Sequence, residues 1–145
     1  MAENNGNVKI HVEHLKKNFG SLEVLKDVSL DIHEGEVVVI LGPSGSGKST
    51  FLRCLNRLEE ITDGTVVVDG YDITDKHTDI NKVRENVGMV FQLFNLFNNL
   101  DVMGNMILAP TELKKADKAE AKERAMQLLR RVGLADKAEA YPAQL

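Results

Sequence analysis

Hydrophobic and polar residues alternate in two segments near the N-terminus. Val8, Ile10 and Val12 are separated by polar residues, and residues 24–32 largely repeat the same two-residue period. Alternation of this kind is typical of β-strands that have one buried and one solvated face. We therefore predict two strands here, within an antiparallel layer.

Other segments are apolar at successive positions instead. Residues 37–41 read VVVIL and residues 87–91 read VGMVF, a pattern typical of strands buried on both faces of a parallel sheet. We predict a buried strand at each. Residues 65–68, TVVV, are also mostly apolar, but Asp69 and Gly70 follow them, and Asp-Gly favours a hairpin turn. This third strand is therefore not expected to end in a metal-binding aspartate.

Helical spacing follows these runs. Apolar residues recur every three or four positions over residues 48–60 and 116–132, and residues 78–85 predict a short helix. Asp117 is a suitable N-cap for the last helix and Gly133 a suitable C-terminal stop. Strands that alternate with helices place the chain in the α/β class.

Composition narrows the possible functions. The chain has 145 residues, enough for one domain, with 43% apolar and 28% charged residues. Its net charge of −4 argues against nucleic-acid binding. Cys54 is the single cysteine, which excludes an internal disulfide. The longest purely apolar run is too short to cross a bilayer, so we predict a cytoplasmic protein without direct membrane insertion.

The strongest chemical signal is the sequence GPSGSGKS at residues 42–49. It matches the phosphate-binding pattern of Gly, four residues, then Gly-Lys-Ser/Thr. Glycines let the backbone approach phosphates closely, and the following helix directs its positive end towards them. Lys48 would contact the β- and γ-phosphates, Ser49 would ligate Mg²⁺, and Thr50 would lie near the α-phosphate. The predicted nucleotide-binding residues of this loop are Gly42, Pro43, Ser44, Gly45, Ser46, Gly47, Lys48, Ser49 and Thr50.

A wider resemblance includes this loop. The segments GEVVVILGPSGSGKSTFLRCLNRLEEITDGTVVVDG and VGMVFQLFNLF resemble the ATP-binding subunit of ATP-binding-cassette (ABC) transporters, of the type that imports polar amino acids. The resemblance extends from about Val8 to Leu145. It implies an ABC-type P-loop NTPase fold: an N-terminal antiparallel β layer, an incomplete parallel α/β core and the start of a helical subdomain. Residues 1–92 would form the β layer and nucleotide-binding core, and residues 93–145 would begin the helical subdomain.

The resemblance also implies roles for single residues. Phe19 would stack on adenine, and Gln92 would contact Mg²⁺ or the attacking water, which makes Lys48 and Gln92 the catalytic candidates. The segment from Leu93 to Asn105 would dock on transmembrane permease subunits, although it departs from the usual family pattern at several positions, including Gly104. Its apolar residues could instead close the local core, and the sequence leaves both interpretations open.

For the complete protein, the resemblance implies a homodimer that hydrolyses MgATP at the inner face of the cell membrane and drives import of a polar amino acid. In that family, the Ser-Gly-Gly-Gln signature, a strand ending in Asp-Glu and a switch histidine follow the position of Leu145. We therefore expect the 145-residue chain to bind ATP and Mg²⁺ but to hydrolyse ATP inefficiently by itself. We also expect its two buried runs to lack neighbouring strands, which makes its fold marginal.

Two other functions remain open at this point. A small P-loop kinase for nucleotides or metabolites would have a similar length, but such kinases usually begin with the phosphate loop, whereas two strands precede it here. The chain could also be a nucleotide-binding fragment without turnover. Transfer of phosphate to a small acceptor would identify the kinase, and binding without phosphate release would identify the fragment.

Overall fold

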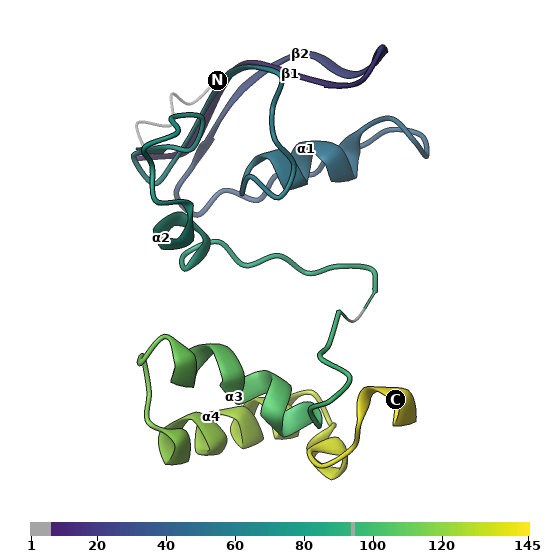
Figure 1. Cartoon of the computed structure of the whole chain (residues 1–145), viewed down its shortest axis with the longest axis vertical. Coiled ribbons are helices and arrows are strands. Elements are labelled where there is room, and N and C mark those ends of the chain that lie inside the picture. The colour runs from purple at the N-terminus through teal and green to yellow at the C-terminus, as the bar shows by residue number, and fades with distance from the viewer. Residues whose placement is uncertain (1–6, 94) are drawn as a thin grey trace. The chain divides into compact units, whose positions relative to one another are not determined.

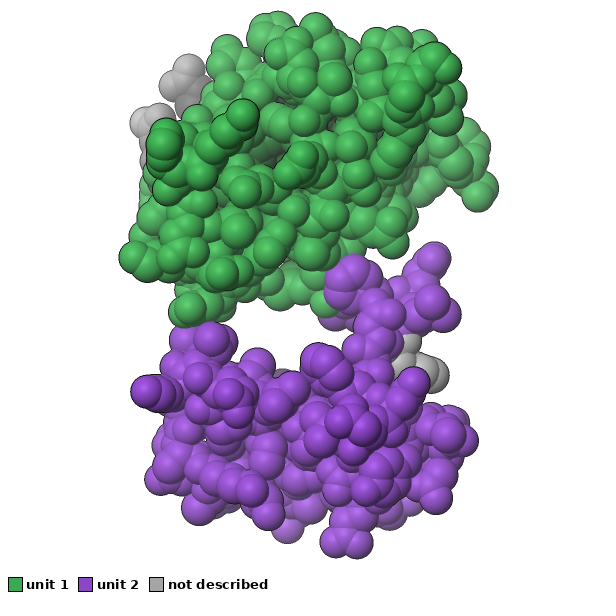
Figure 2. Space-filling model, viewed as in Figure 1, with its two compact units in different colours: residues 1–89 green, residues 90–145 purple. Residues whose placement is uncertain are grey.

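The computed structural model describes residues 7–93 and 95–145. They fall into two compact units, Met1–Met89 and Val90–Leu145, which Figure 2 shows in different colours. The described strands all belong to the first unit, and the second is built from helices. Each unit has its own hydrophobic cluster and is described separately.

The first unit is built on two long strands. β1 (Val8–Phe19) and β2 (Leu22–His33) pair in antiparallel register, with His11 opposite Asp31 and Leu15 opposite Val28. The predicted antiparallel layer is therefore confirmed. β1 runs further than its alternating pattern, because its later residues pair with β3 as far as Lys16 and with β2 as far as Phe19.

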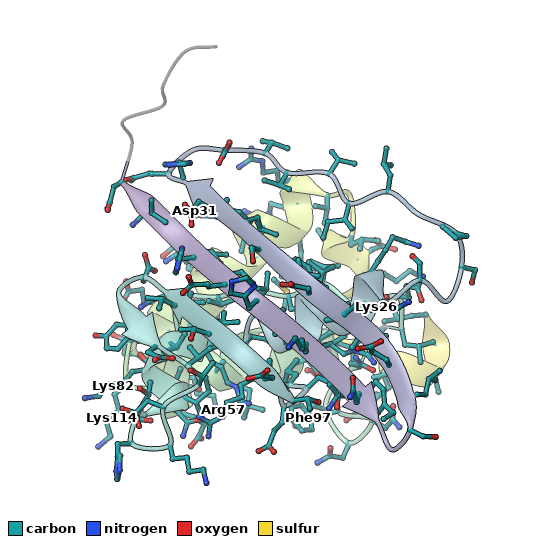
Figure 3. The ribbon with its side chains drawn as sticks, turned by 90° about the horizontal axis from the view of Figure 1, so that it is seen from above. Lys26, Asp31, Arg57, Lys82, Phe97 and Lys114 are labelled. Carbon is teal, nitrogen blue, oxygen red and sulfur yellow. The ribbon has the colours of Figure 1, made fainter. Side chains whose placement is uncertain are left out.

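β3 (Asp63–Val68) pairs with the other edge of β1, and the short β4 (Tyr71–Asp72) pairs with β3. The strand order is β2-β1-β3-β4, and Figure 3 shows β1 lying between β2 and β3. Asp69 and Gly70 connect β3 to β4 with φ angles of +49° and +80°. Positive φ at both central residues is the geometry of a two-residue hairpin, so the turn prediction is confirmed.

Helix α1 (Lys48–Cys54) packs on one face of this sheet, as Figure 1 shows. Its Phe51 and Cys54 join the strand residues Val12, Leu15 and Val66 in one buried cluster. A short helix, α2 (Ile80–Arg84), begins at the N-cap Asp79 and adds Val83 to the same cluster.

The first helix is shorter than its apolar spacing predicted. It ends at Cys54, and the prediction of a helix to residue 60 was wrong. Arg57 has a φ angle of +51°, which no α-helix accommodates, and the side chain of Asn56 accepts a hydrogen bond from Leu58 N at 3.2 Å. This local bond offers the backbone an alternative to the next helical turn.

The two continuous apolar runs are not strands in this structure. Val37 is 89% exposed and Val90 is 99% exposed, so the predictions of buried strands at residues 37–41 and 87–91 were wrong. A strand forms only where a neighbour completes its hydrogen bonds, and the described sheet contains no strand beside either run. The four described strands are antiparallel throughout.

The second unit is a helical hairpin. α3 (Val102–Glu112) and α4 (Lys118–Arg131) pack through Ile107, Ala121 and Ala125. Asp117 caps α4 by accepting hydrogen bonds from Ala119 N and Glu120 N, both at 2.8 Å, as predicted. Gly133, with a φ angle of +74°, follows the end of α4, which confirms the predicted stop.

Two short 3₁₀ turns, η1 (Ala135–Lys137) and η2 (Pro142–Gln144), follow α4. Val102 N donates to Ala140 O at 2.9 Å and Met103 N donates to Ala138 O at 2.8 Å, so this segment satisfies free amides at the start of α3. Gly104 lies inside α3. Within the described part of the chain, no helix has both the length and the apolar character needed to cross a bilayer.

Candidate nucleotide-binding site

The glycine-rich loop is attached to the sheet at its last residue. Gly47 is the N-cap of α1, is buried and has a φ angle of +89°. A Cβ at this position would lie 3.0 Å from side-chain carbons of both Val24 and Leu25 on β2. Glycine therefore provides both the left-handed backbone and the close approach that seat the loop against β2.

The side chain of Lys48 folds back into the loop. Its Nζ donates to Gly42 O at 2.8 Å, to Pro43 O at 2.7 Å and to Ser46 Oγ at 3.4 Å. An ammonium has three hydrogens to donate, and the loop supplies three acceptors. The loop and the lysine therefore hold one another, with a positive charge at the centre of the turn.

The start of α1 adds further donors beside this charge. The helix begins when Phe51 N donates to Gly47 O at 2.8 Å, which leaves the preceding amides outside the intrahelical ladder. Throughout α1, which is fully described, no side chain caps these amides and the first turn carries no acidic residue. Amides, helix dipole and ammonium together favour an anion at this place.

Ser49 is the residue that fits Mg²⁺. Its side chain is exposed in the first turn of α1, next to Lys48. Mg²⁺ commonly takes one or two protein oxygens and completes its shell with phosphate oxygens and water, so a single hydroxyl suffices here. Among the residues that the structure describes, no three His, Cys, Asp or Glu side chains gather into a separate metal site.

Phe19 lies at the end of β1, and its side chain is half exposed. Lys17, two residues earlier, is the register partner of Leu25, against which Gly47 is seated. The aromatic ring is therefore at the same end of the sheet as the loop. This placement suits the adenine-stacking role that the resemblance implies, which stays a prediction.

Gln92 and the segment after it belong to the second unit, whereas the loop belongs to the first. Gln92, Leu93 and Phe97 are exposed. Asn105 organises the segment by accepting a hydrogen bond from Phe97 N at 2.8 Å and donating to Phe97 O at 3.1 Å. Phe94 lies outside the described residues.

Two buried residues, Cys54 and Lys17, lie near the glycine-rich loop and α1. Burial raises the pKa of the Cys54 thiol to about 11, so the thiol stays protonated and serves packing. Lys17, which sequence analysis did not single out, is buried below the Phe19 ring. The available signal was its spacing, because residues i and i+2 on a strand share one face.

Comparisons with known proteins agree with this architecture. The sequence profile of the family described as ABC transporter matches residues 25–145. A glutamine transport ATP-binding protein of Geobacillus stearothermophilus is 53% identical over 136 residues, which cover 94% of this chain and 56% of that protein. An arginine transport ATP-binding protein of Bacillus subtilis (strain 168) is 54% identical over 136 residues, with 94% and 57% covered.

A solved structure shares the fold. The dimeric post-hydrolysis state of the ATP-binding cassette MJ0796, bound to ADP and Pi, aligns with a TM-score of 0.82 and 33% identity over 94% of this chain and 62% of that chain. The resemblance drawn from the motifs and the predicted fold class are therefore confirmed. The chain spans about half the length of the two curated relatives, 56% and 57% respectively.

Proposed function

This chain belongs to the ABC transporter family, and we propose that it binds MgATP as the nucleotide-binding part of an amino-acid importer's ATPase. The observation that carries the proposal is the loop itself. Lys48 places its ammonium 2.8 Å from Gly42 O and 2.7 Å from Pro43 O, beside the open amide end of α1. This arrangement concentrates positive potential where the phosphates of a nucleotide would lie.

Each proposed site residue has a physical role. The backbone amides of residues 42–50 and the ammonium of Lys48 bind the phosphates, and the hydroxyl of Ser49 holds Mg²⁺. Phe19 stacks on the adenine, for which its exposed ring at the end of β1 is suited. Gln92 acts on the metal or the attacking water in the complete ATPase.

The importer assignment draws on the relatives, whose names specify glutamine and arginine transport. We propose that the complete protein works as a homodimer at the cytoplasmic face of the membrane, and the solved relative is itself dimeric. Residues 93–145, which include α3 and α4, would begin the helical subdomain. The exposed side chains of Leu93 and Phe97 support permease docking between Leu93 and Asn105.

ATP hydrolysis coupled to import is proposed for the complete protein. The 145 residues contain no Ser-Gly-Gly-Gln sequence. In ABC ATPases this signature completes the site of the opposite subunit, so we expect the chain alone to bind nucleotide with inefficient turnover. The kinase alternative gains no support, since β1 and β2 precede the loop and the matched family is a transporter family.

The decisive experiment is a calorimetric titration of the 145-residue chain with MgATP, beside Lys48→Ala. We expect the substitution to weaken binding about 100-fold or more, because it removes charge-assisted contacts to the phosphates. Lys26→Ala is the matched control, since Lys26 lies exposed on β2 (Figure 3) and should leave the affinity unchanged. Binding that is equally strong in the Lys48 variant would contradict the proposal.

A further inference from the structure

A buried lysine lies beneath the aromatic ring at the end of β1. Lys17 is only 8% exposed, and Asn56 is the other polar residue buried to this degree in the described chain. The Nζ of Lys17 donates to Glu60 O at 2.7 Å and lies 2.8 Å from the Glu59 carboxylate. The same Nζ lies 4.5 Å from the centroid of the Phe19 ring. A buried lysine requires partners, and this ammonium has a carboxylate, a carbonyl and an aromatic face.

The partners of Lys17 are themselves fixed. Glu59 N donates to Arg53 O of α1 at 3.1 Å, which attaches the segment after the helix to the helix itself. Thr62 N donates to Lys16 O at 2.8 Å, and Thr62 Oγ1 accepts from the backbone amide after Lys17 at 2.9 Å. The segment that follows α1 is thus bonded to β1 on both sides of the lysine. Because α1 begins at the phosphate loop, Lys17 connects the aromatic end of β1 to the helix of that loop.

The ring of Phe19 gains its orientation from this ammonium. Phe19 is 46% exposed and is the last residue of β1, so surrounding packing fixes it only in part. A cation over the face of an aromatic ring is attracted by the ring quadrupole and favours one ring orientation. With one face on the ammonium, the ring is held as a platform and its opposite face can receive a flat base.

We propose that Lys17 is the positioning residue of the base subsite: it holds the ring of Phe19 for stacking on the nucleotide base, separately from phosphate binding. This inference rests on the proposed function and extends it to a residue outside the phosphate loop. It implies that loss of the Lys17 charge weakens binding of a base-containing ligand and leaves binding of a bare polyphosphate unchanged.

The test compares two ligands on four forms of the 145-residue chain: unmodified, Lys17→Gln, Lys17→Arg and Lys16→Gln. Calorimetry measures the Kd of MgATP and of magnesium tripolyphosphate for each. Gln removes the charge and keeps a polar amide donor, and Arg keeps the charge. Lys16, which pairs with Asp63 at 3.2 Å and is half exposed, is the matched control on the same strand.

We expect Lys17→Gln to weaken MgATP binding about three- to tenfold and to leave tripolyphosphate binding unchanged, as loss of one cation–π contact implies. Lys17→Arg should restore most of the MgATP affinity, and Lys16→Gln should change neither ligand. A second measurement repeats Lys17→Gln in a Phe19→Leu background, where the substitution should have no further effect on MgATP, because the ring is already absent.

Three outcomes would overturn the inference: equal weakening of both ligands by Lys17→Gln, an undiminished effect in the Phe19→Leu background, or unchanged MgATP binding. Either of the first two outcomes would show that Lys17 stabilises the folded chain in general and does not position the Phe19 ring. A chain whose MgATP binding is independent of Lys48 would overturn the proposed function, and this inference with it. If MgATP binding depends on Lys48 but is unchanged by Lys17→Gln, only the inference about Lys17 is overturned.

Discussion

Two apolar segments of the first unit have nearly the same chemistry and opposite structures. β3 contains three consecutive valines, and so does the run at residues 37–41. In β3, Val66 is fully buried, whereas Val39 in the run is 73% exposed. β3 has β1 on one side and β4 on the other, and the run has no strand beside it in the described sheet. An apolar sequence therefore favours a strand, but the strand forms only where a neighbouring backbone can pair with it.

The glycine-rich loop follows directly on the unpaired run, but the hydrogen bonds of Lys48 that hold the loop go to residues after the run. The contacts that fix the loop are the bonds of Lys48 to Gly42 O and Pro43 O, together with the seating of Gly47 against β2. Local hydrogen bonds and one close packing contact therefore suffice for the loop. A strand requires a partner that runs along its whole length.

Substitution of valine by alanine should destabilise β3 far more than the run at residues 37–41. Val66→Ala should lower the free energy of unfolding by about 2–3 kcal/mol, because it removes buried methyl groups and leaves a cavity. The same substitution at the exposed Val39 should change it by less than about 0.5 kcal/mol. Urea unfolding of both variants measures the difference. Equal losses would mean that residues 37–41 are buried in solution, and the contrast between the segments would fail.

A smaller effect should distinguish two glycines of the loop, Gly45 and Gly47. Gly45 and Gly47 have similar φ angles of +80° and +89°, but a Cβ on Gly45 meets nothing within 4 Å. We expect Gly45→Ala to cost about 1 kcal/mol from backbone strain, and Gly47→Ala to cost about 2 kcal/mol because its Cβ also contacts β2. Unfolding by urea again provides the values. A larger cost at Gly45 would show that seating on β2 is not what holds the loop.

The smallest effect concerns the paired strands β1 and β2. The side-chain hydrogen bond from His11 to Asp31, with an Nδ1–Oδ1 distance of 2.5 Å, raises the pKa of His11 above its ordinary value of 6.5. A raised folded-state pKa adds stability below the unfolded value, and this stability disappears as pH rises through the folded pKa. Glu13, 4.0 Å from His11 Nε2, acts in the same direction.

Asp31→Asn should therefore destabilise the chain at about pH 5.5 and have less effect at about pH 8.5, a contrast that urea midpoints at both values measure. His11→Gln is the companion variant, in which Asp31→Asn should lose this dependence on pH. If Asp31→Asn lowers the urea midpoint equally at both pH values, the pair contributes to stability through packing and not through charge.

Sequence patterns predicted the parts of this fold that depend on nearby residues. The alternation of Val8, Ile10 and Val12, the turn at Asp69 and the N-cap at Asp117 all depend on contacts within a few positions or on a simple period. The predictions at residues 37–41 and 87–91 failed because pairing depends on strands distant in sequence. The first helix ended early because Arg57 adopts a positive φ angle that no periodicity reveals.

At the candidate site, the sequence motifs predicted the glycine-rich loop as a phosphate-binding site, and the wider motifs identified the family correctly. The spacing of the glycines and the lysine that follows them act within a few residues, so the pattern alone predicts phosphate binding. The contacts of Lys17 with Glu59 and Glu60, by contrast, are visible only in the folded chain. More than forty positions separate these partners along the chain, since the hydrogen bond to Glu60 O spans 43. Such a contact exists only after β1 and the segment behind α1 have packed together.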